Sequence, residues 1–272
     1  MFKFMLAPIE DMTSPAFRTI CYRYGADLTF TEMTRVESLA KGNKSTWSKI
    51  TLKDDTPTEI QLMGAKEYNF KKFLSQFSPS KGFKGFNINL GCPNPKVIAL
   101  GHGCAMTRRI TKTQKIVNII KDYNHIVSVK LRLGLNQQDK QRKVYLNLIN
   151  AVDADYFIVH ARHGAQSYFD KADFSVYEEC VETGKDIIAN GDIKTKEQIQ
   201  FLKSVNVKGA MIGRAAIVNP TIFNELKGNK SPSLQQVKEE FLKLSEQYQE
   251  APKFVKNVSK HLAVSPNNFL SL

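Results

Sequence analysis

The chain alternates between short apolar runs and longer amphipathic segments from its first residues to about residue 228. The short runs are rich in β-branched and aromatic residues, which is typical of buried strands. Eight runs are predicted to be strands: residues 4–8, 27–33, 58–63, 85–90, 126–132, 155–161, 186–190 and 208–213. Between them, segments 14–24, 111–123, 140–152, 194–204 and 220–226 have the spacing of helices with one apolar face. Strands that alternate with helices predict a parallel sheet.

Eight strands, most of them followed by a helix, match the (β/α)8 or TIM barrel, an α/β fold. The 272 residues of the chain suit a barrel, which typically takes roughly 250. A doubly wound sheet is the alternative, with five or six strands and a Gly-rich first turn. The first predicted turn, residues 7–17, contains no glycine. The sequence therefore predicts a barrel catalytic domain over residues 1–228.

Residues 229–272 have a different pattern, which predicts a short helical C-terminal region. Ser233 and Gln236 fit a capping box at the start of a helix. One apolar stripe follows at helical spacing, made of Leu234, Val237, Phe241, Leu244 and Tyr248. A second short helix is expected over residues 253–262. We expect this appendage to be held to the barrel, or to a partner, by that stripe.

Charge narrows the class of partner. Lys and Arg number 39 against 26 Asp and Glu, for a net charge of +13. Such an excess favours a polyanionic partner such as nucleic acid, although it also serves solubility. No apolar stretch approaches the roughly 20 residues of a membrane helix, and the N-terminus lacks a signal-peptide pattern. A cytoplasmic protein without a membrane anchor is expected.

Motifs for metals and nucleoside triphosphates are missing from the sequence. The four cysteines have no paired spacing, and neither a C-x-x-C pair nor an HExxH motif occurs. Cysteines without a pairing pattern in a cytosolic chain are expected to be free thiols. No metal site is predicted, and no P-loop is present.

Polar residues gather at the carboxyl ends of the predicted strands, where barrel enzymes hold their catalytic groups. One such residue alone is weak evidence of an active site, because a lone His is usually a hydrogen-bonded structural residue and a lone Lys is usually solvated. Seven clusters at seven strand ends favour an active site. They are Glu32; Gln61; residues 89–93, which include Asn89 and Cys92; Lys130 with Arg132; His160 with Arg162; Asn190, Gly191 and Asp192; and Gly213 with Arg214.

The clusters that end the seventh and eighth strands predict a phosphate site. Barrels commonly bind phosphate there, with backbone N–H groups and the start of a short helix. Gly191 and Gly213 allow the backbone to approach an anion, and Arg214 offers a fork of donors. The alternative is that residues 190–192 are a plain turn and Arg214 is an exposed residue at a helix start.

Cys92 is the candidate for reactive chemistry among the four cysteines. It lies in a turn directly after the fourth strand, between Gly91 and Pro93. The thiol could act as nucleophile or proton donor, or be a small buried apolar residue. A cysteine hydrolase that pairs Cys92 with His160 would leave Gln61, Lys130 and the phosphate loops without a role. Cys104 has no role that the sequence indicates.

The clusters, in this order, resemble the tRNA-dihydrouridine synthase family over residues 4 to about 226. The most specific motif is Asn-Leu-Gly-Cys-Pro at 89–93, followed by Lys-Val at 96–97 and Gly-His-Gly at 101–103. Supporting motifs are Thr-Glu-Met at 31–33, Gln-Leu-Met-Gly at 61–64, Lys-Leu-Arg-Leu-Gly at 130–134, His-Ala-Arg at 160–162, Asn-Gly-Asp-Ile at 190–193 and Ile-Gly-Arg-Ala-Ala at 212–216. The chain departs from the family in having Ile9 where Met is usual, and in a shorter C-terminal helical region.

The resemblance implies an FMN enzyme that takes reducing equivalents from NADPH, or NADH, and reduces the C5–C6 bond of uridine in tRNA. It implies that Cys92 is catalytic and protonates C5, and that Asn89 and Arg162 lie near the target uridine. The remaining positions that it assigns would bind FMN: Pro8, Ile9, Glu10, Gln61, Lys130, His160, Asn190, Gly191, Asp192, Gly213 and Arg214.

A basic rim agrees with a tRNA substrate, because a uridine must leave its stack to reach a cofactor inside a barrel. Basic residues follow strand ends at Lys41 and Lys44, at 108–115 and at 140–143. Two alternatives are an FMN barrel acting on a free pyrimidine, similar to dihydroorotate dehydrogenase, and a tRNA-binding protein without catalysis. The target uridine, the choice between NADPH and NADH, and the oligomeric state stay open, although a monomer is compatible with the sequence.

Overall fold

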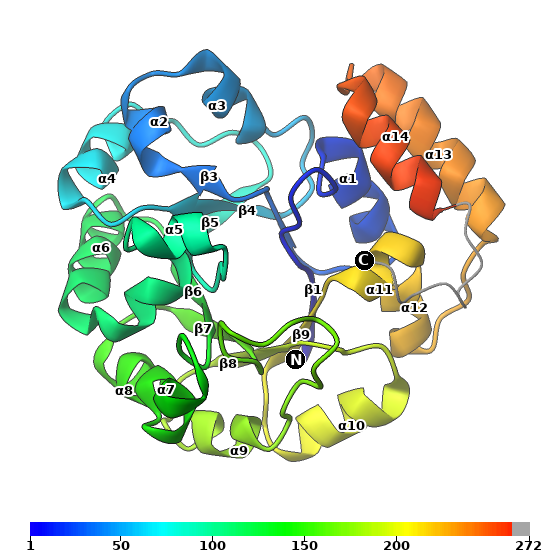
Figure 1. Cartoon of the computed structure of the whole chain (residues 1–272). Helices are drawn as coiled ribbons and strands as arrows, with labels where there is room; N and C mark the ends of the chain where they lie inside the picture. The colour runs from blue at the N-terminus through cyan, green and yellow to red at the C-terminus, as the bar shows by residue number, and fades with distance from the viewer. Residues whose placement is uncertain (263–272) are drawn as a thin grey trace.

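The computed structural model describes residues 1–262, in which the strands form one parallel sheet. The order around the sheet is β1 (Lys3–Leu6), β9 (Gly209–Ile212), β8 (Ile187–Asn190), β7 (Tyr156–His160), β6 (Val127–Arg132), β5 (Phe83–Leu90), β4 (Thr58–Met63) and β2 (Thr29–Phe30). A parallel bridge between Met5 of β1 and Leu28, the residue before β2, joins the two ends of this order, and the N–H of Leu6 donates to the carbonyl of Leu28 at 2.9 Å. The ring of strands is visible in Figure 1. The predicted TIM barrel is confirmed.

The second strand of the barrel is split into two short strands, whereas the sequence predicted one strand over 27–33. β2 is followed by β3 (Thr34–Arg35), which pairs with the other end of β4. Between them, the backbone N–H of Gln61 donates to the hydroxyl of Thr31 at 3.0 Å instead of to a backbone carbonyl. A side chain therefore replaces one ladder bond, and the strand is interrupted at residues 31–33.

Helices surround the strands in the described part of the chain (Figure 1). They are α1 (Pro15–Arg23), α2 (Val36–Ala40), α3 (Lys44–Lys49), α4 (Glu67–Leu74), α5 (Pro95–Ala99), the 3-10 helix η1 (Gly103–Arg108), α6 (Ile110–Asp122), α7 (Gln137–Gln141), α8 (Val144–Ala151), α9 (Val176–Val181), α10 (Lys196–Ser204), α11 (Arg214–Val218) and α12 (Ile222–Lys227). Ser14 and Thr195 accept backbone N–H groups at the starts of α1 and α10. The single helix predicted over 140–152 is wrong. Lys143 has a left-handed φ of 53°, which separates α7 from α8.

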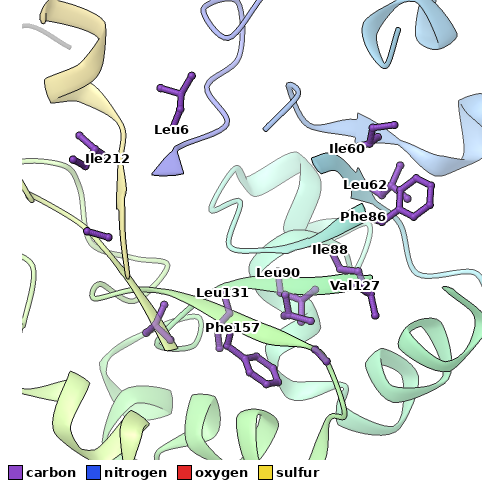
Figure 2. Close-up of a cluster of buried hydrophobic side chains, with 14 of the residues drawn as sticks. Leu6, Ile60, Leu62, Phe86, Ile88, Leu90, Val127, Leu131, Phe157 and Ile212 are labelled. Atoms are coloured by element: carbon purple, nitrogen blue, oxygen red, sulfur yellow. The ribbon is translucent and has the colours of Figure 1, made fainter. Parts of the chain in front are cut away.

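Most of the core lies between the sheet and the helices. Side chains at alternate strand positions point to this layer, among them Leu6, Ile60, Leu62, Phe86, Ile88, Leu90, Val127, Leu131, Phe157 and Ile212 (Figure 2). The intervening positions face the lumen, because successive strand residues point to opposite faces. Met5, Phe30, Ile158, Ile188 and Met211 form a smaller apolar cluster there. One side of the lumen is thus apolar, and its remaining positions are available for polar groups.

The C-terminal region forms two helices, α13 (Leu234–Gln247) and α14 (Pro252–His261), beside α1 (Figure 1). The capping box of Ser233 and Gln236 is confirmed. The carboxylate of Glu250 caps α1 by accepting from the hydroxyl of Ser14 and the N–H of Ala16, both at 2.7 Å. Burial raises the pKa of Glu250. Polar contacts, together with the apolar stripe, therefore hold this region to the barrel.

Leu234 is half-buried, whereas Val237, Phe241, Leu244 and Tyr248 are buried, so the predicted apolar stripe faces the protein. The Tyr248 hydroxyl also donates to Asp54 at 2.8 Å. No helix among the described residues is both long and apolar enough to cross a membrane.

Candidate active site

A cavity of about 640 Å³ opens at the carboxyl ends of the strands, on the side of the barrel formed by β1 and β6 to β9. Its walls are Ala7, Pro8, Ile9, Glu10, Met12, Lys130, His160, Arg162, Tyr168, Asn190, Gly191, Asp192, Ile193, Lys194, Met211, Gly213, Arg214, Ala215 and Ile217, with Asn257 and His261 of α14. The volume is in the range of ligand and cofactor pockets, roughly 300–1,000 Å³. Its lining includes apolar side chains such as Pro8, Ile9 and Met12 and the cationic side chains of Lys130, Arg162 and Arg214.

Lys130 lies in the wall of this cavity and contacts an amide oxygen. Its ammonium donates to the Oδ1 atom of Asn190 at 2.9 Å, while the Nδ2 atom of Asn190 donates to the carbonyl of Met211 at 2.9 Å. Burial, with a further contribution from Arg132, lowers the pKa of Lys130 to about 7. An anion or a partly negative ring placed here would gain a cation that forms no ion pair with a carboxylate of residues 1–262.

Two arginines are oriented by one carboxylate at the cationic end of the cavity. Asp192 accepts from the Nη2 atom of Arg162, which is buried, and from Nη2 of Arg214 at 2.7 Å. The guanidinium of Arg214 also lies over the ring of Tyr168, 4.7 Å from its centroid. A carboxylate repels phosphate, so the side chain of Asp192 serves to orient the arginines.

The backbone is exposed to the cavity where β8 and β9 end. Gly191 has a φ of +116°, and a Cβ at this position would lie 3.0 Å from the ring of His160. Both the left-handed conformation and the close ring require glycine. At the end of β9, α11 begins directly after Gly213. Both loops line the same cavity as Arg214, and main-chain N–H groups at a helix start are a common phosphate-binding element.

Cys92 lies in a rigid turn after β5. The Oδ1 atom of Asn89 accepts from the N–H of Gly91 at 3.1 Å and from that of Cys92 at 3.0 Å. Cys92 is partly exposed, whereas the other three cysteines are buried. Cys104 donates through its thiol to the carbonyl of Gly134 at 3.1 Å, and burial raises the pKa of that thiol to about 12. Cys92 is therefore the accessible thiol, and Cys104 is a core residue.

Sequence comparison decides the family. A model of the dihydrouridine synthase family matches residues 5–267. The chain belongs to the dihydrouridine synthase family. A probable tRNA-dihydrouridine synthase of Helicobacter pylori is 31% identical over 233 residues, which cover 82% of this chain and 70% of that protein. Probable tRNA-dihydrouridine synthase 2 of Bacillus subtilis is 32% identical over 257 residues, 90% of this chain and 78% of that protein. The predicted enzyme family is confirmed.

A human tRNA-dihydrouridine(47) synthase-like protein is 31% identical over 229 residues, which cover 83% of this chain but 35% of the human protein. The chain therefore spans about a third of that relative's length. Among solved structures, morphinone reductase in complex with tetrahydroNAD has a TM-score of 0.56 and 10% identity, over 88% of this chain and 90% of that one. At this identity the likeness shows the barrel fold alone.

Most residues that the family resemblance assigns lie together in the cavity. Pro8, Ile9, Glu10, Lys130, His160, Arg162, Asn190, Gly191, Asp192, Gly213 and Arg214 all line it. Gln61, Asn89 and Cys92 do not line it. Gln61 lies in β4, Asn89 lies in β5, where it pairs in register with Lys130, and Cys92 lies in the turn after β5. The role of each residue stays a prediction.

The sequence did not predict several of the residues that line the cavity. Tyr168 comes from the long loop after β7, and Asn257 and His261 come from α14. The unusual length of that loop was the available signal for Tyr168. Nothing in the sequence placed α14 over the barrel mouth, because this contact joins segments some 250 residues apart, as in the bond from the Asn257 side chain to the carbonyl of Asp11 at 3.3 Å.

An acidic group lies at the edge of the cavity, where the carboxylates of Glu10, Asp11 and Glu32 are within 4.8 Å of one another. Lys49 and Lys253 pair with Glu10 and Asp11, and the buried Glu32 accepts from the N–H of Asp11. Burial raises the pKa of Glu32. Lysines pair with two of the three carboxylates, and burial and the neighbouring carboxylates raise the pKa of the third, Glu32. The group therefore gives no ground for a metal site, and the prediction of none stands untested.

Several cations of the predicted basic rim are already paired with carboxylates. Arg108 makes a two-pronged ion pair with Asp139, and Lys140 pairs with Asp173. Lys143 pairs with Glu179. By contrast, Arg109 and Arg142 are exposed, and neither forms an ion pair within the described residues. Only part of the predicted cluster is thus free to meet phosphates.

Proposed function

We propose that this protein is a tRNA-dihydrouridine synthase, which reduces the C5–C6 bond of uridine in tRNA with FMN and NADPH or NADH. The observation that carries the proposal is the cationic cavity at the strand ends, with the partly exposed Cys92 in the turn after the adjoining strand β5. Family membership supports the reaction, and the names of the bacterial relatives support the tRNA substrate.

FMN fits the cavity by its chemistry. Its phosphate would be held by the main chain at Gly191 and Gly213 and by the guanidinium of Arg214, which Asp192 already orients. The apolar wall of Pro8 and Ile9 would cover a flat ring.

The polar groups around the ring position would orient the cofactor. When bound, FMN supplies two-electron redox chemistry between the nicotinamide and the pyrimidine. Lys130 and Gln61 would hydrogen-bond the ring, and the ammonium of Lys130 would stabilise negative charge on it. His160 and Asn190 would complete that wall of the site.

Cys92 would donate the proton that the reduced uridine needs at C5. Its Sγ–H is a general acid placed at the mouth of the barrel by the Asn89 turn. Asn89 and Arg162 would lie beside the uracil. A flipped uridine would enter next to Tyr168, which lines the cavity and has an exposed ring that would face the base.

The exposed cations Arg109 and Arg142 would contact tRNA phosphates on the face that carries the cavity. We further propose residues 1–228 as the catalytic barrel and 229–272 as a helical region that contributes to tRNA docking. A cytoplasmic location accords with this substrate.

Three measurements test the proposal. The purified protein should be yellow and should release FMN on denaturation. With NADPH or NADH it should form dihydrouridine in tRNA transcripts and leave free uridine and orotate unchanged. Turnover of a free pyrimidine without tRNA would favour the free-pyrimidine oxidoreductase, and tRNA binding by a protein that cannot be loaded with FMN would favour a non-catalytic role.

A further inference from the structure

A buried carboxylate lies on the floor of the barrel, far from the cavity walls. Glu59, near the start of β4, is 2% exposed. Its Oε1 atom accepts from the hydroxyl of Tyr156 at 2.6 Å, and its Oε2 atom accepts from the hydroxyl of Ser128 at 2.5 Å. Burying a carboxylate is unfavourable unless its hydrogen bonds offset the loss of water, and nothing in the proposed reaction uses this group.

From Ser128 a chain of hydrogen bonds rises through the lumen toward the mouth. The Nδ2 atom of Asn87 donates to the hydroxyl of Ser128 at 2.7 Å, and the Nε2 atom of Gln61 donates to Oδ1 of Asn87 at 2.7 Å. The Nδ2 atom of Asn89 then donates to Oε1 of Gln61 at 2.9 Å. These side chains alternate along β4, β5 and β6 with the apolar ones that face the helices, so they all point into the lumen.

The upper end of the chain is the turn that holds Cys92. There the Oδ1 atom of Asn89 accepts the two backbone N–H groups of Gly91 and Cys92. The chain therefore connects the floor carboxylate with the backbone of the accessible cysteine, and every bond in it runs in the same direction.

Groups of unambiguous polarity fix that direction at both ends. At the mouth, backbone N–H groups can only donate, so Asn89 must present its oxygen to them and its Nδ2 to Gln61. At the floor, an ionised carboxylate can only accept, so the hydroxyl of Ser128 must donate to Glu59 and is left to accept from Asn87. Each amide between them has one orientation that satisfies both neighbours.

We propose that Glu59 is a positioning residue that, through Ser128 and Asn87, fixes the amide orientations of Gln61 and Asn89 and thereby the turn that presents Cys92. Without the acceptor at the floor, the amides can turn over. A reversed Asn89 would place an Nδ2 donor against the N–H groups of Gly91 and Cys92 and release the turn. The catalytic consequence rests on the proposed function, whereas the effect on the Cys92 turn does not.

Alkylation of the native protein tests the turn without tRNA or NADPH. Cys92 is the one cysteine of the four that is not buried, so modification by iodoacetamide reports on it alone. At about pH 8.5 Glu59 is ionised, since burial raises its pKa only to about 7. Ser128→Ala removes a link of the chain and should raise the alkylation rate at least about fivefold, as expected for the loss of hydrogen bonds.

The matched control is Thr29→Val, which also deletes one buried hydroxyl near the floor of the barrel. The hydroxyl of the buried Thr29 forms hydrogen bonds with Pro57 and Thr58 and takes no part in the row of hydrogen bonds from Glu59 to Asn89. Its variant should therefore be alkylated at the wild-type rate even if it is equally destabilised. Two variants of Glu59 distinguish the effect of its negative charge from the effect of its hydrogen bond to Ser128. Glu59→Gln keeps an oxygen that can accept from Ser128 and should resemble wild type, whereas Glu59→Leu should resemble Ser128→Ala.

In the reaction, Ser128→Ala should lower kcat for uridine reduction about tenfold, with KM for tRNA unchanged. Equal alkylation rates for Ser128→Ala and Thr29→Val, whether both are as slow as wild type or both are fast, would overturn the proposal. If the wild type makes no dihydrouridine but the alkylation pattern holds, the proposed function fails and the positioning role of Glu59 stands.

Discussion

The Nη1 atom of Arg162 lies 3.1 Å from the Nε2 atom of His160. A guanidinium can only donate, so Nε2 must accept and the imidazole carries its proton on Nδ1. Burial, together with the charges of Lys130, Arg132, Arg162 and Arg214, places the pKa of His160 well below its usual range. His160 is therefore a neutral donor through Nδ1, and it should not titrate in the range where the protein binds its ligands.

Lys130 should make FMN binding pH-dependent. Its pKa is lowered to about 7, and a bound anion raises it again, so binding takes up a proton above pH 7. Affinity should be constant below pH 7 and should weaken as the pH rises, by up to about tenfold per pH unit. Titration of the deflavinated protein between pH 6 and 9 measures this. Lys130→Met should abolish the dependence, and wild-type affinity that stays constant to pH 9 would refute it.

Arg214 should contribute strongly to FMN affinity, because it would donate to the phosphate from a position fixed by Asp192. Loss of a charge-assisted hydrogen bond of about 1.5–3 kcal/mol predicts roughly 10- to 100-fold weaker binding for Arg214→Ala. Arg214→Lys should be intermediate, since it keeps the charge and loses the fork. Arg109→Ala, outside the cavity, is the control and should bind FMN normally. Fluorescence titration compares the variants.

Cys92→Ala should reduce the rate of uridine reduction by roughly 10²–10⁴-fold, the usual contribution of a general acid. Oxidation of the reduced flavin by unrelated acceptors should be unchanged. Cys104→Ala is the matched control, because that thiol is buried and bonded to Gly134. A Cys92→Ala enzyme with full activity would return Cys92 to a structural role.

The free cations of the rim should govern tRNA affinity. Arg109→Ala combined with Arg142→Ala should weaken binding and flatten its salt dependence by about one unit of slope for each lost phosphate contact. Lys84 and Lys208 are exposed at the opposite end of the barrel, near the starts of β5 and β9, so their double alanine variant removes the same charge as a control. Filter binding at several salt concentrations separates them, and equal losses in both would contradict this docking face.

Glu250 should stabilise the junction of the C-terminal helices with the barrel. Its carboxylate caps α1 through Ser14 and Ala16, so Glu250→Ala should lower the free energy of unfolding by about 1–3 kcal/mol. Glu246→Ala, at an exposed position of α13, is the control. Thermal denaturation of both variants gives the comparison, and an unchanged Tm for Glu250→Ala would argue that the apolar stripe alone holds the helices.

Local patterns carried enough information to predict the barrel, because strand periodicity and caps depend on neighbouring residues. The capping boxes at Thr195 and Ser233 and the apolar strand faces are of this kind. The break at Lys143 was not predictable, since a left-handed backbone is uncommon for a residue other than glycine and lysine does not mark one. Ion pairs between residues far apart in the sequence could not be predicted either. Arg108 is 31 positions from Asp139, so sequence alone left its side chain apparently free.

The placement of α14 bears on the modularity of the chain. Asn257 and His261 form part of the cavity wall, and Lys253 pairs with Asp11 at its edge. A grafted C-terminal region from a relative would therefore alter the pocket as well as the surface. Exchange of these helices between family members is expected to transfer substrate preference only when the loop at residues 9–12 is exchanged with them, which makes the two segments a single unit of recombination.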